Sequence, residues 1–287
     1  MWRFTVKSAL FTGAAVTLGL LLASTGPAQA RPTDPSSPDA VTAAPQPTPQ
    51  ARQHGIHKAG DAYMGWLHNT TTSSAPAAPA PAAVVEGIDV SSHQGNVDWQ
   101  YWWNQGKRFA YVKATEGTSY RNPYFAQQYN GSYNIGMIRG AYHFALPNNS
   151  SGATQANYFA SNGGGWSRDG RTLPGALDIE YNPYGATCYG LSQSAMVSWI
   201  RDFVNTYKSR TGRDAVIYTN LDWWTRCTGN STAFNATNPL WVARYSSTVG
   251  TLPGGWPYYT FWQWTSSPLD QNHFNGDQSR LVALANG

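Results

Sequence analysis

Short apolar runs alternate with segments of helical periodicity over residues 86–287. The runs are rich in β-branched and aromatic residues and are bounded by Gly, Pro and Asn, which is the pattern of buried strands. They predict five strands, at residues 87–90, 109–114, 137–144, 176–180 and 216–219. The apolar stripe of one intervening helix, which Gly212 ends, consists of Met196, Trp199, Ile200, Phe203 and Tyr207. Asn122-Pro123 predicts another helix, with Asn as its cap and Pro at its first position.

The rhythm changes after residue 219. Residues 240–245 and 259–264, and a weaker segment at 270–274, predict three more strands with no long helix between them. Strand–helix alternation favours a parallel sheet. Eight strands with helices after only the first five therefore predict an α/β fold, a modified TIM-like barrel of (β/α)5(β)3 type. We expect a single catalytic domain, because barrels of this length are commonly undivided.

The region before the domain has a different composition. Residues 1–30 resemble a secretory signal: Arg3 and Lys7 precede an apolar run, and Ala28-Gln29-Ala30 is a small-residue cleavage site. The alternative is a membrane anchor, for which the run is short against the roughly 20 residues of a span. Residues 31–85 are rich in Ala, Pro, Thr and Ser and predict a linker or pro-segment. Within them, AGDAYMGWLHN (59–69) is less simple and is a candidate for docking elsewhere on the protein.

Cysteine content and net charge limit the surroundings and binding partners that suit the protein. The two cysteines, Cys188 and Cys227, predict a disulfide in an exported protein, the alternative being two buried thiols. No cysteine or histidine spacing indicates a metal site. The net charge is +4, of which roughly +2 belongs to residues 86–287. This weak positive charge favours adsorption to anionic polymers such as cell walls, and it is too diffuse to indicate nucleic-acid binding.

The segment LPGALDIE (173–180) carries the clearest chemistry. Residues i and i+2 of a strand point to the same face, so Asp178 and Glu180 should project side by side. Two carboxyls in one pocket push their pKa values apart, so that one stays protonated while the other is ionised. Glycoside hydrolases use such a pair of carboxyls to cleave a glycosidic bond. Asp89 and Glu116 also follow predicted strands, where parallel barrels place their active sites.

Seven ordered motifs resemble glycoside hydrolase family 25, the Chalaropsis-type lysozymes, in its secreted bacterial branch. They are GIDVSSHQGNVDW (87–99), YVKATEG (111–117), RGAYHFA (139–145), LPGALDIE (173–180), VIYT (216–219), LWVARY (240–245) and FWQWTS (261–266). The resemblance implies a modified barrel of five helices and eight strands. It also implies hydrolysis of the β-1,4 bond from N-acetylmuramic acid to N-acetylglucosamine in peptidoglycan.

The resemblance also implies roles for individual residues. The general acid of the family falls on Glu180, its partner carboxylate on Asp178 and the strand-one carboxylate on Asp89. Asp178 would orient the N-acetyl group of the substrate for attack from within the sugar; the alternatives make Asp178 or Asp89 a nucleophile or a base acting on water. A later acidic residue falls on Asp270, with Asp277 as the rival because LDQNHFNGD departs from the commoner family pattern.

Aromatic residues are expected to line part of the groove, since sugar rings stack on aromatic planes. Tyr142 and Phe144 match aromatic positions of the family, and Trp241 and Trp264 are further candidates for substrate binding. Glu116 would tune the acidic cluster or pair with a base.

Simpler structural interpretations exist for several of these residues. Glu180 could form a salt bridge with Arg244 or Lys113, and Asp89 could cap a turn near Ser91 and Ser92. His93 and His143 are expected to be structural hydrogen-bonding residues.

Two other functions compete with the hydrolase. A chitinase of the DxE type would carry further Asp residues at positions 173 and 176, where this chain has Leu and Ala. A wall-binding module without activity would lack one of the acidic residues, and all are present. We therefore expect a secreted, extracellular monomer that acts on peptidoglycan polysaccharide. It should need no cofactor and no metal, and it should bind no nucleic acid and, after signal removal, no membrane.

Overall fold

The computed structural model describes residues 44–67 and 83–287, so the signal predicted at residues 1–30 lies outside the described residues. Eight strands close into a barrel, with β3 (Tyr120–Arg121) as a short hairpin partner at the end of β2. The barrel strands are β1 (Val84–Val90), β2 (Phe109–Glu116), β4 (Ile138–Phe144), β5 (Ala176–Asp178), β6 (Val216–Thr219), β7 (Leu240–Ala243), β8 (Phe261–Thr265) and β9 (Gln271–Asn275).

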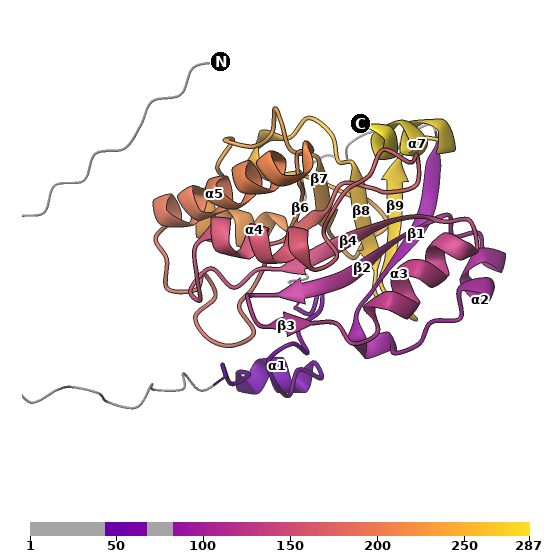
Figure 1. The fold of residues 1–287 in the computed structure, drawn as a ribbon. Coiled ribbons are helices and arrows are strands. Elements are labelled where there is room, and N and C mark those ends of the chain that lie inside the picture. The colour runs from indigo at the N-terminus through magenta and orange to yellow at the C-terminus, as the bar shows by residue number, and fades with distance from the viewer. Residues whose placement is uncertain (1–43, 68–82) are drawn as a thin grey trace, which may run out of the picture. The chain divides into compact units, whose positions relative to one another are not determined.

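Helices follow the first five barrel strands and not the next two (Figure 1). They are α2 (Trp99–Asn104), α3 (Phe125–Asn134), α4 (Gly152–Ser161), α5 (Gln193–Thr211) and α6 (Leu221–Thr228). The turns η1 (Ser92–Gln94) and η2 (Pro253–Gly255) are 3₁₀-helical, α1 (Pro49–Gln53) precedes the barrel, and α7 (Gln278–Asn286) follows it. The predicted (β/α)5(β)3 barrel is confirmed; α7 was not predicted.

The barrel is parallel from β1 through β8 and is closed by one antiparallel strand. β9 lies between β8 and β1, with Phe261 opposite Phe274 and Val84 opposite Asn275. The expectation of a parallel sheet is therefore wrong for β9. Residues 266–270 are too few for the crossover that a parallel neighbour requires, so the chain turns back on itself. As a result, β9 begins at the end of the barrel where the other strands terminate.

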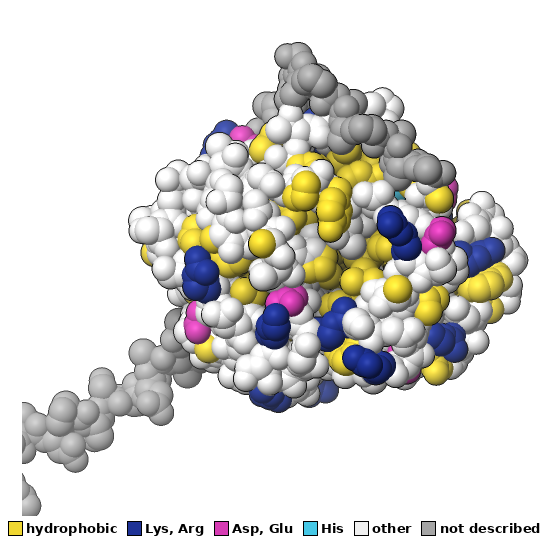
Figure 2. All heavy atoms as spheres, turned by 90° about the horizontal axis from the view of Figure 1, so that it is seen from above, with side chains coloured by type: hydrophobic (Ala, Val, Ile, Leu, Met, Phe, Trp, Pro, Cys, Tyr) yellow, Lys and Arg dark blue, Asp and Glu magenta, His cyan; other side chains and the backbone are white. Residues whose placement is uncertain are grey.

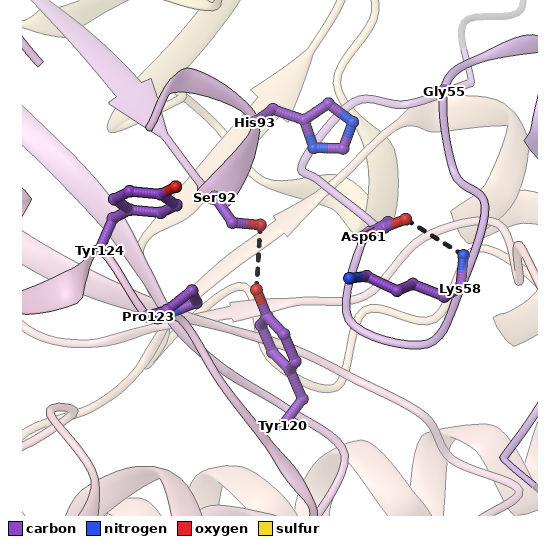
Figure 3. Close-up of a pocket in the computed structure, with 8 residues that line it drawn as sticks. All are labelled: Gly55, Lys58, Asp61, Ser92, His93, Tyr120, Pro123 and Tyr124. Carbon is purple, nitrogen blue, oxygen red and sulfur yellow. Dashed lines mark hydrogen bonds between the residues drawn. The ribbon is translucent and has the colours of Figure 1, made fainter. Parts of the chain in front are cut away.

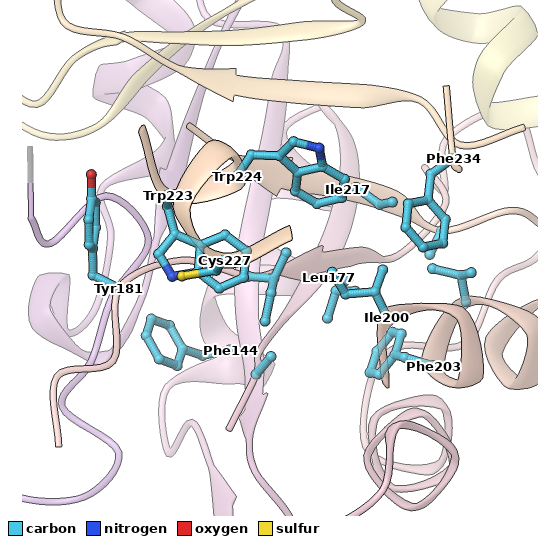
Figure 4. Packing of buried hydrophobic residues seen from close by; sticks show 14 of the residues in the cluster. Phe144, Leu177, Tyr181, Ile200, Phe203, Ile217, Trp223, Trp224, Cys227 and Phe234 are labelled. Carbon is cyan, nitrogen blue, oxygen red and sulfur yellow. The ribbon is translucent and has the colours of Figure 1, made fainter. Parts of the chain in front are cut away.

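Two packed layers follow from the alternation of side chains along the strands. Inward-facing rings fill the barrel interior, where Tyr111 packs against Trp241 with centroids 4.6 Å apart. Outward-facing residues such as Leu177 and Ile217 pack under α5 and α6 (Figure 4). The predicted apolar stripe of α5 is buried in this outer layer.

One of the two predicted helix boundaries is confirmed and the other is wrong. Gly212 ends α5 in the left-handed region at φ +75°, as predicted. The start of α3 lies at Phe125, with Tyr124 as its cap, so the boundary predicted at Asn122-Pro123 is wrong. The Asn122 side chain lies in the turn before the helix: its Oδ1 accepts from the Tyr124 amide at 2.9 Å, and its amide donates to the Lys113 carbonyl and to Gln128 Oε1.

The predicted disulfide is confirmed. Cys188, in the loop after β5, is bonded to Cys227 in α6, with Cα atoms 5.3 Å apart. The face seen in Figure 2 carries dispersed Lys and Arg side chains with fewer Asp and Glu between them. Among residues 44–67 and 83–287, none of the helices has the length and apolar character of a membrane span.

Candidate active site

Four carboxyl side chains gather where the parallel strands of the barrel end. Asp89 lies near the end of β1, Asp178 ends β5, Glu180 follows two residues later, and Asp270 directly precedes β9. All four are at least 94% buried. Because β9 is antiparallel, its first residues share this end of the barrel, which we call the mouth, with the last residues of the other strands. The sequence-predicted carboxyls therefore meet at one place.

Asp178 and Glu180 form the centre of the cluster. The backbone stays extended after Asp178, with the Ile179 amide donating to the Tyr218 carbonyl at 3.1 Å, so both carboxyls face the mouth. Within the described residues, no N–H or O–H group donates to either oxygen of Asp178 or to Oε2 of Glu180. Oε1 of Glu180 accepts from the Gly65 amide at 2.6 Å. The carboxyls of Asp178 and Glu180 are close enough to hydrogen-bond to each other when one of them is protonated.

Electrostatics separate the roles of the two groups. Burial raises the pKa of Glu180 well above its ordinary value, and the negative charge of Asp178 raises it further. Burial also raises the pKa of Asp178, but the positive charge of Lys113 opposes this shift. The pKa values of both groups are raised, and the charges of Lys113 and Asp178 favour the proton on Glu180 over the proton on Asp178.

Asp89 is fixed by a network of amide side chains. Its Oδ2 accepts from Gln263 Nε2 at 3.0 Å and from Asn272 Nδ2 at 2.7 Å. Burial raises the pKa of Asp89 to about 7, although these two hydrogen bonds oppose the shift. The alternative in which Asp89 caps a turn is wrong: the cap of η1 is Ser91, paired with Gln94.

Asp270 and Asp277 lie at opposite ends of β9. Asp270 is at the mouth, where its backbone carbonyl accepts from the Asp89 amide at 3.1 Å. Burial, followed by the charges of Asp89 and Asp178, raises the pKa of Asp270 well above its ordinary value. Asp277 caps α7 by accepting from the Arg280 amide. The geometry thus favours Asp270 as the later acidic residue of the cluster.

Glu116 is paired with a buried cation. Lys113 Nζ lies 2.5 Å from Glu116 Oε2, and Tyr184 donates to Glu116 Oε1 at 2.5 Å. This is the expected pairing with a base. Lys113 therefore bridges to Glu116 rather than to Glu180, and it supplies positive charge at the centre of an acidic mouth.

The predicted aromatic residues divide into two groups. Tyr142 is buried beside the cluster, since the charges of Asp89 and Asp178 contribute to its raised pKa after burial, and Phe144 lies 5.3 Å from Lys113 Nζ. Trp241 is buried in the interior layer and reaches Asp89 only through Asn272, to which its indole donates at 2.8 Å. Trp264 points outward from β8 and stacks on His273. These two tryptophans do not contact the carboxyls of the cluster.

The two histidines differ in surroundings. His143 is buried between Thr115 and Gln155, with ring nitrogens 2.8 and 2.9 Å from their side-chain oxygens. Burial lowers its pKa to about 4, so it stays neutral, in keeping with a structural role. His93 packs against Tyr63 with centroids 4.6 Å apart.

The sequence interpretation missed the residues that hold Asp89. Gln263 and Asn272 occupy inward positions of β8 and β9, and both are fully buried. A usable signal was present: Gln263 interrupts an aromatic strand, FWQWT, where a buried amide needs partners. The described residues contain no group of three or more His, Cys, Asp and Glu side chains arranged to hold a metal ion.

Comparisons with known proteins agree with this geometry. The family model described as "Glycosyl hydrolases family 25" matches residues 88–273. Lysozyme M1 of Streptomyces globisporus is 54% identical over 72% of this chain and 74% of its own length. N,O-diacetylmuramidase of Chalaropsis sp is 50% identical over 71% of this chain and 100% of its own.

Two solved structures are also similar to this chain. The muramidase from Acremonium alcalophilum is 63% identical, with a TM-score of 0.70 over 71% of this chain and 99% of its own. The bacterial lysozyme from Streptomyces coelicolor is 54% identical, with a TM-score of 0.70 over 71% of this chain and 98% of its own. By motifs, barrel and comparisons together, this chain is a glycoside hydrolase and belongs to glycosyl hydrolases family 25.

Proposed function

We propose that the protein is a secreted lysozyme that hydrolyses the β-1,4 bond between N-acetylmuramic acid and N-acetylglucosamine in bacterial peptidoglycan. The observation that carries the proposal is the buried pair of Asp178 and Glu180 at the mouth of a family 25 barrel. The substrate is supported by the names of the relatives, lysozyme and diacetylmuramidase. The weak positive charge of the domain suits an anionic polymer.

Glu180 acts as the general acid. Its carboxyl proton passes to the glycosidic oxygen while the bond from that oxygen to the anomeric carbon breaks. The acetamido oxygen of the same sugar forms the new bond to the anomeric carbon. Water then attacks that carbon, the bond from the acetamido oxygen to the carbon breaks, and the water gives a proton to the Glu180 carboxylate, which restores the acid.

Asp178 orients the acetamido group by accepting a hydrogen bond from its N–H. Both of its oxygens lack a donor among the described residues, and Lys113 favours its ionised form, so it is suited to accept from a substrate. Its negative charge also stabilises the positive charge that develops in the sugar.

The remaining predicted residues surround this pair. Asp89 is held in position by the amides that bind its Oδ2, and it adds a negative charge at pH values above its pKa of about 7. Asp270, Glu116, Tyr142 and Phe144 form the wall on which the substrate rests. Trp241 acts on Asp89 only through Asn272, so we do not include it in this wall. Trp264, which stacks on His273 outside the cluster, is not included either.

The proposal also includes export of the protein from the cell. Residues 1–30 serve as the signal and the segment predicted at 31–85 as a linker or pro-segment. The catalytic domain, predicted to start at residue 86, includes β1 from Val84 and acts as a monomer. The disulfide between Cys188 and Cys227 supports an oxidising destination.

Mass analysis of fragments from digested peptidoglycan tests the function. The sugar at each new reducing end names the bond that is cut, and we expect N-acetylmuramic acid. N-acetylglucosamine at the new reducing ends would refute the proposal, and chitin cleaved in preference to peptidoglycan would favour the chitinase alternative.

A further inference from the structure

Residues 44–67 lie across the mouth of the barrel. They precede β1 in the chain and fall outside the family match at residues 88–273. Figure 1 shows α1 beside β3, at the end of the barrel where β2 terminates. The Thr48 amide donates to the Pro183 carbonyl at 2.8 Å, which anchors the start of α1 to the loop after β5. We call residues 44–67 the mouth segment.

The mouth segment makes a direct hydrogen bond to the proposed acid. The Gly65 amide donates to Glu180 Oε1 at 2.6 Å. Nearby, the indole of Trp66 donates to the Tyr181 carbonyl at 2.9 Å. Tyr63 is close enough to the cluster that the charges of Asp270 and Glu180 add to burial in raising its pKa to about 12. A substrate sugar would need the space around Glu180 that this backbone occupies.

A second group of contacts joins the mouth segment to Lys113 and Glu116. The Gly60 amide donates to Glu116 Oε1 at 3.0 Å. Lys113 Nζ donates to the carbonyl of Gly60 at 3.0 Å and also to the carbonyl of Ala62. The mouth segment therefore supplies hydrogen-bond partners to both Lys113 and Glu116.

Burial shows that this contact is packed rather than loose. Ala62 and Met64 are completely buried, and Trp66 is 1% exposed. Met64 belongs to the interior cluster that contains Tyr142 and Trp241, so its side chain enters the barrel. Apolar residues placed in this way stabilise the docked segment by removing their surface from water.

Part of the groove beside the mouth segment stays open. A cavity of about 400 Å³ lies between Gly55, Lys58 and Asp61 of the mouth segment and five residues of the barrel (Figure 3). The barrel residues are Ser92, His93, Tyr120, Pro123 and Tyr124. Asp178 and Glu180 do not line this cavity, so this open space is away from the proposed chemistry.

We infer that residues 44–67 are a built-in inhibitor, which occupies the substrate site of the barrel and keeps the full chain inactive until it is displaced. This inference rests on the proposed function. Since the mouth segment and a polysaccharide need the same space at Glu180, binding of one excludes the other. The tether to β1 also keeps the mouth segment at a high effective concentration, so soluble substrate competes poorly.

Two glycines of the mouth segment provide a matched pair of variants. Gly65 and Gly55 have similar positive φ values, +74° and +79°, so Gly→Ala adds comparable backbone strain at each. A Cβ at Gly65 would lie 2.5 Å from Tyr245 Oη and 2.6 Å from Gln263 Oε1. A Cβ at Gly55 would meet only His93 Nε2, at an ordinary 3.6 Å. A difference in activity between Gly65→Ala and Gly55→Ala would therefore report the contact of Gly65 with the mouth and not the backbone strain.

The experiment measures peptidoglycan hydrolysis and amide hydrogen exchange in the full chain. We expect wild type and Gly55→Ala to have low activity and slowly exchanging amides at positions 60 and 65. Gly65→Ala should exchange quickly there and be at least tenfold more active. Gly60→Ala is a second way to displace the mouth segment, because its Cβ would lie 2.1 Å from the Tyr120 ring.

The outcomes separate the two proposals. Equal activity of wild type and Gly65→Ala, with exchange showing the mouth segment released in the variant, would overturn the inhibitor and leave the lysozyme standing. Absence of peptidoglycan hydrolysis from a variant whose mouth segment exchanges freely would overturn the lysozyme, and the inhibitor with it.

Discussion

Replacing Glu180 by Gln should abolish activity and at the same time stabilise the fold. The two side chains have the same shape, and the Gln carbonyl still accepts from the Gly65 amide that binds Glu180 Oε1. The Gln amide would donate to Asp178, whose oxygens have no donor among the described residues. What the variant loses is the proton that the proposed reaction delivers to the leaving group.

The expected loss of rate follows from this proton. General acid catalysis contributes about 10²–10⁴-fold, which corresponds to about 3–5 kcal/mol of transition-state stabilisation. Other carboxyls of the mouth are poorly placed to replace it. Glu116 is paired with Lys113 at 2.5 Å, and Asp89 Oδ2 accepts two hydrogen bonds. Substrate affinity should change little, because the missing interaction belongs to the transition state.

Glu180→Gln should raise the stability of the fold while it lowers the rate. The pKa of Glu180 is raised in the native state, so its contribution to stability is full below its ordinary pKa and is lost as the pH rises through the native value. Gln carries no such charge. The melting temperature of Glu180→Gln should therefore equal that of wild type near pH 4 and exceed it increasingly towards pH 8.

The two effects are measured in two backgrounds, because the rate needs an open mouth and the stability argument needs a closed one. Release of reducing ends from peptidoglycan gives the rate, in chains that carry Gly65→Ala to open the mouth. Thermal melts at several pH values give the stability, in chains with Gly65 unchanged, where the Gly65 amide still binds residue 180. Glu86→Gln is the control, because Glu86 lies near the start of β1, away from the mouth, and its side chain is 45% exposed, although its partner Lys107 is buried; it should leave the rate unchanged. Retention of more than about a tenth of the activity by Glu180→Gln, against the ~10²-fold minimum, would show that another residue is the acid.

Two further variants and one chemical treatment test the site and the fold around it. Asp178→Asn should slow turnover and move the alkaline limb of the pH–rate profile to lower pH, because loss of the neighbouring charge lowers the pKa of Glu180; an unmoved limb would contradict the coupling. Asp89→Asn should raise the melting temperature at pH 8 but not below pH 4, since the native pKa is about 7 against 3.8 and the stability it provides is lost across that interval. Reduction of Cys188–Cys227, 39 residues apart, should cost about 4 kcal/mol and lower the melting temperature by roughly 8–16 °C; an unchanged melt in reductant would refute this.

Local patterns were sufficient for most of the fold. Apolar runs and the turns between them located the eight strands, and the pairing of Asp178 with Glu180 followed from the two-residue period of a strand. The direction of β9 did not follow, because a strand of QNHFN has the same alternation whether it runs parallel or antiparallel. That direction decides whether Asp270 or Asp277 reaches the mouth.

Contacts between distant parts of the chain were the main omission. Asp89 is held by Gln263 and Asn272, more than 170 positions away in sequence, and no local pattern reports such a partner. The unusual composition of residues 59–69 indicated docking, but not where. The destination depends on the shape of the mouth, which exists only after the strands close.

Closure of the barrel by β1 and β9 gives the active site an order of appearance. The first and last strands of the domain pair with each other, so the ring is incomplete until residues 271–275 have left the ribosome or crossed the membrane. The mouth segment precedes all of them and emerges first. On the inference that residues 44–67 inhibit the barrel, a nascent chain carries its inhibitor before its site is complete.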